Sequence, residues 1–123
     1  TYERAFVAHM ASFQISGPIP APVADASPIL SLGPHFPKIL VVAFEGFVAD
    51  QGAGVAVELY KNAGTVDAKL LATLTLASAG VVTAATITET PCVEGDFLSV
   101  RVSDNGGTGV DLEVHVVYLV YGI

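Results

Sequence analysis

The sequence predicts an all-β fold: an antiparallel two-sheet jelly-roll sandwich of about eight strands. Two observations predict it. Short runs rich in Val, Leu, Thr and aromatic residues recur along the chain, and Gly, Asn, Asp or Pro separate them. No run carries apolar residues at helical spacing over several turns. The chain of 123 residues is long enough for one domain, residues 1–123, with a core of its own.

The N-terminal third divides into an arm, a loop and the start of the main sandwich. Residues 1–16 form an N-terminal arm and the first strand, expected over 4–15 (RAFVAHMASFQI). Residues 17–37 hold six of the seven prolines, which predicts a crossing loop with at most a short strand at 28–32. The main sandwich, 38–123, begins with a run over 38–48 that is apolar on both faces.

The rest of the main sandwich alternates more regularly. KNAG (61–64) has the residues of a tight turn, and DNGGTG (104–109) is expected to be a hairpin tip. In KLLATLTL the alternation places Leu70 on the face of Ala72 and Leu71 on the opposite face. Five further strands are expected, at 55–60, 69–76, 81–88, 97–103 and 111–121.

Composition argues against two classes of partner. Twelve acidic and five basic residues give a net charge of -7, whereas nucleic acids and anionic membranes require clustered Lys and Arg. No stretch reaches the roughly 18 apolar residues of a membrane span. We therefore expect no nucleic-acid partner and no membrane partner. With 52% hydrophobic and only 14% charged residues, part of the surface is expected to be buried against another chain.

The two terminal strands are apolar on both faces. In the closing strand Leu112 and its even-numbered neighbours form one apolar face, while on the other face polar residues give way to Val117, Leu119 and Tyr121. Each such side chain left in water forgoes about 1.5–3 kcal/mol of burial. We expect a second copy to cover them; the alternative is that the loop 17–37 folds over this face. The predicted interface comprises Phe6, Ala8, Met10, Val117, Leu119 and Tyr121.

Several stretches carry a resemblance to a known family. VELYKNAG (57–64), VEGDFLSVRV (93–102) and the closing strand resemble the globular head domains of complement and the tumour-necrosis-factor superfamily. They are more similar still to the version of this jelly roll in phage and bacterial surface proteins, over roughly residues 38–121, with Ala63 inserted into the usual Asn-Gly turn. The resemblance implies a homotrimer whose first and last strands are adjacent on the sheet that faces the threefold axis.

Polar residues that could do chemistry are few. Asp96, after Glu94 and Gly95, is expected to accept backbone N–H bonds and shape the turn; the alternative is a calcium ligand together with Glu94 or Asp104. His9 and His115 lie on strands expected to be neighbours, so they could approach each other. The single Cys92 is expected to be a small buried residue.

These observations favour a non-enzymatic structural role. No nucleophile elbow, phosphate-binding glycine loop or HExxH motif is present, so we expect no catalytic residues, no metal and no cofactor. The leading hypothesis is a homotrimeric capsid decoration (cement) protein or head-fibre base on a virion surface, bound to a major capsid or fibre protein. The residues given contain no secretory signal.

Two alternatives remain open. One is a receptor- or glycan-binding tip of a tail fibre, with its site in the loops 50–54, 77–80 and 104–109 and with Phe47 or Tyr60 as stacking aromatics. The other is a secreted, extracellular complement-like ligand.

Overall fold

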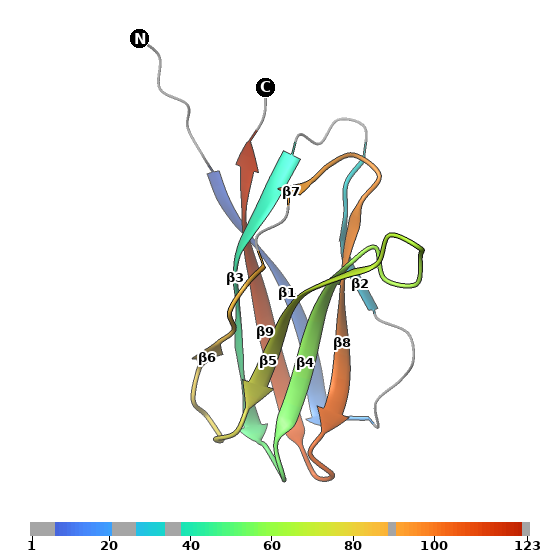
Figure 1. Ribbon diagram of the computed structural model, residues 1–123. Coiled ribbons are helices and arrows are strands. Elements are labelled where there is room, and N and C mark those ends of the chain that lie inside the picture. Colours follow the sequence, from blue (N-terminus) through green and yellow to red (C-terminus); the bar gives the residue numbers. More distant parts are fainter. Residues whose placement is uncertain (1–6, 21–26, 34–37, 89–90, 122–123) are drawn as a thin grey trace.

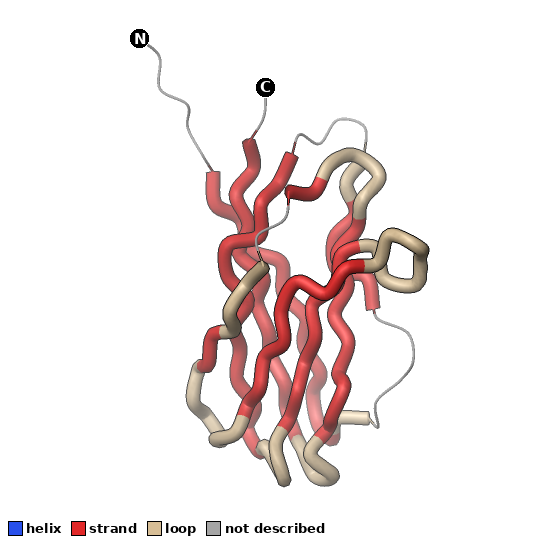
Figure 2. Tube along the Cα trace, viewed as in Figure 1, coloured by secondary structure: helices blue, strands red, loops and turns tan. Residues whose placement is uncertain are grey.

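The structure is a computed structural model that describes residues 7–20, 27–33, 38–88 and 91–121; for Val7 and Tyr121 it describes the backbone alone. The described residues form β-strands joined by turns and loops, without a helix long and apolar enough to cross a membrane (Figure 2). Nine strands are present in this part of the chain. They are β1 (Val7–Pro18), β2 (Ser27–Ser31), β3 (Lys38–Asp50), β4 (Val55–Lys61), β5 (Lys69–Leu76), β6 (Thr83–Ala84), β7 (Pro91–Cys92), β8 (Phe97–Asn105) and β9 (Val110–Tyr121).

The strands form two antiparallel sheets packed face to face (Figure 1). The first sheet has the order β1-β9-β3-β6, with β7 also paired to β3, and the second has the order β2-β8-β4-β5. The first and last strands are therefore neighbours, and Val7 pairs with Val120 at the end of the sandwich where β1 begins and β9 ends; we call this end the chain-end side. The predicted two-sheet antiparallel sandwich is confirmed.

The core lies between the two sheets. The inward faces predicted for 55–60, 97–103 and 111–121 are confirmed, because Val57, Val100 and Val114 and their alternate neighbours are buried. The largest buried side chains, each less than 2 % exposed, include Ile39, Phe44, Leu59, Leu71, Leu74, Leu76, Leu98 and Leu112.

In two places a β-bulge changes which residues of a strand face the core, so simple alternation along the sequence does not predict them. In β3 the register with β9 shifts between Val41 and Ala43, so Ile39 and Val41 point inward before the bulge and Phe44 after it. A second bulge lies between β4 and β5. It turns Leu71 into the core and leaves Leu70 43% exposed, so the predicted placement of these two leucines was wrong.

Two other expectations were wrong because strands that are consecutive in sequence belong to different sheets. The residues 104–109 are not a hairpin tip, since β8 lies in one sheet and β9 in the other. Of the strand expected over 81–88, only β6 pairs with β3. Just after it, the Thr88 N–H donates to the Leu71 carbonyl of the opposite sheet at 2.8 Å, so this segment spans the gap between the sheets.

Candidate functional site

The outer face of the first sheet carries an apolar surface on the chain-end side. Residues directly opposite each other in a sheet share a face. Ala8 on β1 and Leu40 on β3 both pair with Leu119, and one step along Met10 and Ala43 both pair with Val117. We name these six residues the apolar patch: Ala8, Met10, Leu40, Ala43, Val117 and Leu119.

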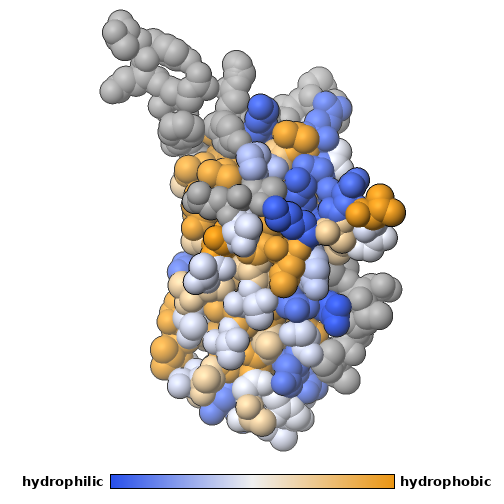
Figure 3. Space-filling model, in the orientation of Figure 1, coloured by the Kyte–Doolittle hydropathy of each residue, from blue (hydrophilic) through white to orange (hydrophobic). Residues whose placement is uncertain are grey.

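The patch is accessible in the single chain. Met10 is 59% exposed, Ala8 is exposed, and the four residues on β3 and β9 are half-buried. Phe6, predicted for the same interface, lies outside the described residues, and so does the side chain of Tyr121. On the visible side, hydrophobic residues gather over the flank formed by β3 and β6 (Figure 3).

The described part of the Pro-rich loop does not cover the patch. Within 17–37, β2 pairs with β8 in the opposite sheet, and Ile19 and Leu32 are buried in the core between the sheets. The loop residues 21–26 and 34–37 lie outside the described part.

Next to the patch, the outer face becomes polar around His115. Its Nε2 lies 2.7 Å from Glu113 Oε2, and its Nδ1 lies 3.1 Å from Ser12 Oγ. Glu45 is its partner on β3. His9 instead pairs with the buried Tyr118 and stacks on its ring, with the ring centres 5.6 Å apart. The two histidines therefore lie on opposite faces of the sheet, and the expected approach between them does not occur.

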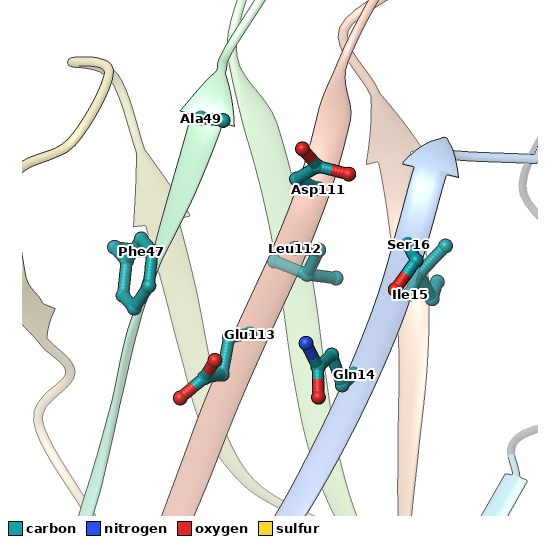
Figure 4. A pocket seen from close by; sticks show the side chains of 8 residues that line it. All are labelled: Gln14, Ile15, Ser16, Phe47, Ala49, Asp111, Leu112 and Glu113. Atoms are coloured by element: carbon teal, nitrogen blue, oxygen red, sulfur yellow. The ribbon is translucent and has the colours of Figure 1, made fainter.

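The same outer face is hollowed near the other end of the sandwich, where β1 and β3 end and β9 begins; we call this the loop end. A groove of about 310 Å³ runs across β9 between β1 and β3 (Figure 4). Phe47 forms one side, Gln14 and Ser16 form the other, and the carboxylates of Asp111 and Glu113 project from β9 between them. We name these residues and the space between them the groove.

Asp96 shapes its turn as the sequence indicated. Its Oδ2 accepts the Val93 N–H at 2.9 Å and lies 3.5 Å from Lys61 Nζ. Its Oδ1 accepts the Asn62 side-chain N–H at 2.9 Å. Burial raises the pKa of Asp96, but the hydrogen bonds from Asn62 and Val93 and the charge of Lys61 outweigh it and lower that pKa below its usual value.

Asn62, which the sequence indicated only as a turn residue, connects two turns that are distant in the sequence. It is only 8% exposed, and its backbone has a positive φ of 57°. Its side-chain oxygen accepts the Phe97 N–H at 3.0 Å while its amide donates to Asp96, so it bridges the β4–β5 loop to the turn before β8. An Asn in a turn motif, followed much later by an acidic Gly-Asp turn, is the signal that could have indicated the pair.

The residues considered for an ion do not come together. Asp96 precedes β8 and Asp104 lies near its other end, so the strand separates them by about 25 Å. Asp104 instead accepts the Gly106 N–H at 2.9 Å, and Glu94 is exposed. Among the described residues, no three His, Cys, Asp or Glu side chains gather in a way that could hold a metal ion.

Cys92 is fully buried in the core cluster. Burial is the main reason that the pKa of its thiol is raised, and the nearby Asp96 raises it further while Lys61 lowers it. A buried thiol with a raised pKa is a weak nucleophile at neutral pH.

The loops considered for a binding tip gather at the end away from the chain-end side. The Ala53 N–H donates to the Gly106 carbonyl at 2.9 Å, and the Gly80 N–H donates to the Val48 carbonyl at 2.8 Å. Phe47 and Tyr60, however, lie on outer sheet faces and not in these loops. Phe47 pairs with Glu113, and the Tyr60 hydroxyl donates to Glu58 at 3.3 Å.

Comparison with known proteins identifies the fold. No family model matches the chain, and no curated protein matches it. Among solved structures, the chain is similar to that of Eiger TNF from S. frugiperda, with 13% sequence identity and a TM-score of 0.55 over 97% of this chain and 94% of that chain. The fold is therefore a TNF-like jelly roll.

Proposed function

We propose that this chain is a non-enzymatic structural protein that forms a homotrimer through the outer face of its first sheet. The apolar patch carries the proposal. It is continuous across three adjacent strands, and it lies in a protein where only 14% of residues are charged. Fully burying an exposed side chain contributes about 1.5–3 kcal/mol, so covering Met10 would contribute most, and each half-buried side chain of the patch would contribute a smaller part of that amount. Three copies meeting at an axis would cover the patch in each copy.

Met10 is the residue on which to test self-association. In the single chain its side chain is 59% exposed, so Met10→Asp should change the stability of one copy by only about 0.5 kcal/mol. At a contact between copies the same change would bury an unpaired carboxylate, which is strongly unfavourable. The wild-type chain should sediment as a trimer at micromolar concentration, and Met10→Asp as a single chain.

Thr75→Asp is the matched control. Thr75 is exposed on the second sheet, far from the patch, and the substitution adds the same charge. It should leave the trimer intact. A wild-type chain that sediments as a single copy at micromolar concentration would refute the proposed assembly.

We propose further that the trimer decorates a viral capsid or forms the base of a head fibre, in contact with a major capsid or fibre protein. This rests on the similarity of VELYKNAG and VEGDFLSVRV to the jelly rolls of phage and bacterial surface proteins. Immunogold electron microscopy of native particles tests it. Label at threefold positions on the capsid is the expected result, and particles without label would overturn this role while leaving the trimer untouched.

A second candidate is an extracellular ligand of the TNF-like type. The similarity to the Eiger TNF structure favours it, because it extends over nearly the whole of both chains. Antigen in the medium of the source cells and absent from particles would favour this candidate.

A further inference from the structure

Phe47 occupies an unusual position for a large aromatic residue. Beyond the bulge in β3, Phe44 and Val48 point into the core, so Phe47 points outward. Its partner across the strands is Glu113. The ring is half-buried and lies away from the apolar patch. The other residues that line the groove are the polar Gln14, Ser16, Asp111 and Glu113 and the apolar Ile15, Ala49 and Leu112. Core packing therefore does not explain why a phenylalanine stands there.

The polar groups around the ring keep hydrogen-bonding capacity. Asp111 uses Oδ1 to accept the Gly17 N–H, and Glu113 uses Oε2 to contact His115. Within the described residues, the second oxygen of each carboxylate makes no hydrogen bond, nor do the side chains of Gln14 and Ser16. In Figure 4 these groups surround one space beside the Phe47 ring.

We propose that the groove binds one residue of a neutral saccharide. A pyranose ring has a face of C–H groups, which is attracted to the negative face of an aromatic ring such as Phe47. Its hydroxyls can donate to Asp111 and Glu113 and exchange hydrogen bonds with Gln14 and Ser16. The volume of about 310 Å³ is at the lower end of the range for small-ligand sites, about 300–1,000 Å³, which suits a single sugar.

Charge selects among saccharides. Two carboxylates project into the groove, and no Lys or Arg is among the residues that line it in the described part of the chain. A sugar acid would bring a third carboxylate into this space without a cation to pair it. The groove should therefore prefer neutral hexoses and N-acetylhexosamines over uronic acids.

The groove and the apolar patch share the outer face of the first sheet, and a contact between copies along this whole face would cover the groove. Saccharide titration is therefore done on the single-chain Met10→Asp variant as well as on the wild-type chain. The groove lies at the loop end of β1, β3 and β9, whereas the apolar patch lies on the chain-end side. Sedimentation of the Met10→Asp variant reports on assembly, and saccharide titration reports on the groove, so the two ideas fail separately.

Two-dimensional amide NMR on the full chain tests the proposal. The probes are the methyl glycosides of glucose, galactose, mannose and N-acetylglucosamine, with methyl glucuronide as the anionic comparison. At least one neutral glycoside should shift the amide signals of residues 14–16, 47–49 and 111–113 at millimolar concentration. Methyl glucuronide should bind more weakly than methyl glucoside.

Substitutions identify the groups that bind. Phe47→Leu keeps an apolar side chain but removes the aromatic face, and should weaken binding about tenfold, whereas Phe47→Tyr should retain it. Glu113→Gln is a second, milder variant that should also weaken binding. Tyr60→Leu, on the other sheet, is the control and should leave binding unchanged. Absence of shifts at these residues with all four neutral glycosides, or equal affinity in Phe47→Leu, would overturn the proposal.

Discussion

Replacing Asn62 by glycine should destabilise the fold markedly, although the residue stands in a surface turn. Glycine accepts the positive φ of 57° without strain, so the substitution removes the side-chain bonds and little else. Two bonds are lost, one to the Asp96 carboxylate at 2.9 Å and one from the Phe97 N–H at 3.0 Å. The turn before β8 would then no longer be bound to the β4–β5 loop through this side chain.

The magnitude follows from the character of the two bonds. A hydrogen bond to a charged group contributes about 1.5–3 kcal/mol, and one between neutral groups about 0.5–1.5 kcal/mol. Asn62→Gly should therefore lower the free energy of unfolding by about 2–4 kcal/mol. Asn62→Ala should lower the free energy of unfolding by about 1 kcal/mol more than Asn62→Gly does, because the alanine Cβ is unfavourable at a φ of 57°. Asn62→Asp keeps an acceptor for Phe97 but places a second carboxylate beside Asp96, so it should recover stability in acid.

Urea unfolding followed by circular dichroism, at one fixed protein concentration, measures these differences. A loss of about 3 kcal/mol corresponds to a melting temperature lower by about 10 °C or more. Ala63→Gly is the matched control, since it puts glycine in the same turn without removing a side-chain bond, and should cost at most about 1 kcal/mol. If Asn62→Gly unfolds within about 0.5 kcal/mol of the wild type, the bridge contributes nothing and the reasoning is refuted.

Two further predictions follow from the same structure. Gly46→Ala should lower the free energy of unfolding by about 1–3 kcal/mol, because the added Cβ would meet the backbone carbonyl of Glu113 on β9. Gly33→Ala is the control, since there is open space around Gly33. Equal urea midpoints for the two variants would contradict the prediction. The lowered pKa of Asp96 means that its contribution to stability is present above the unfolded carboxyl pKa of about 3.9 and is lost as the pH falls through the lower folded value. Asp96→Asn should therefore show a weaker decline of unfolding free energy below about pH 4 than the wild type, and parallel pH profiles would contradict this.

Alternation in the sequence was enough to predict the sandwich and most of its core. Each strand of a two-sheet sandwich buries one face, so the period of two in 55–60, 97–103 and 111–121 reports directly which residues lie inside. The double-sided apolar character of the closing strand likewise predicted the patch around Val117 and Leu119, because hydrophobicity is a property of each residue and needs no knowledge of its neighbours.

Pairing between strands was decided by tertiary structure. A glycine-rich turn such as 104–109 has the same local chemistry whether it joins partners in one sheet or passes between sheets, so the sequence could not tell that β8 and β9 are not paired. Two bulges place Leu71 in the core and change which residues of β3 face inward. Both depend on the partner strand, because register is a property of a pair of strands.

For the groove and the Asn62–Asp96 bridge too, the sequence determined the residue types and the tertiary structure determined which of them come together. The sequence specified their chemistry: a phenylalanine, carboxylates, and turn residues that tolerate positive φ. Only the folded sheet set Gln14 and Phe47 on either side of β9, and only the packing of two distant turns brought Asn62 within 2.9 Å of Asp96. The physical reason is that side-chain type and local alternation are encoded within a few residues, whereas contacts between residues 30 or more positions apart depend on how the whole chain closes.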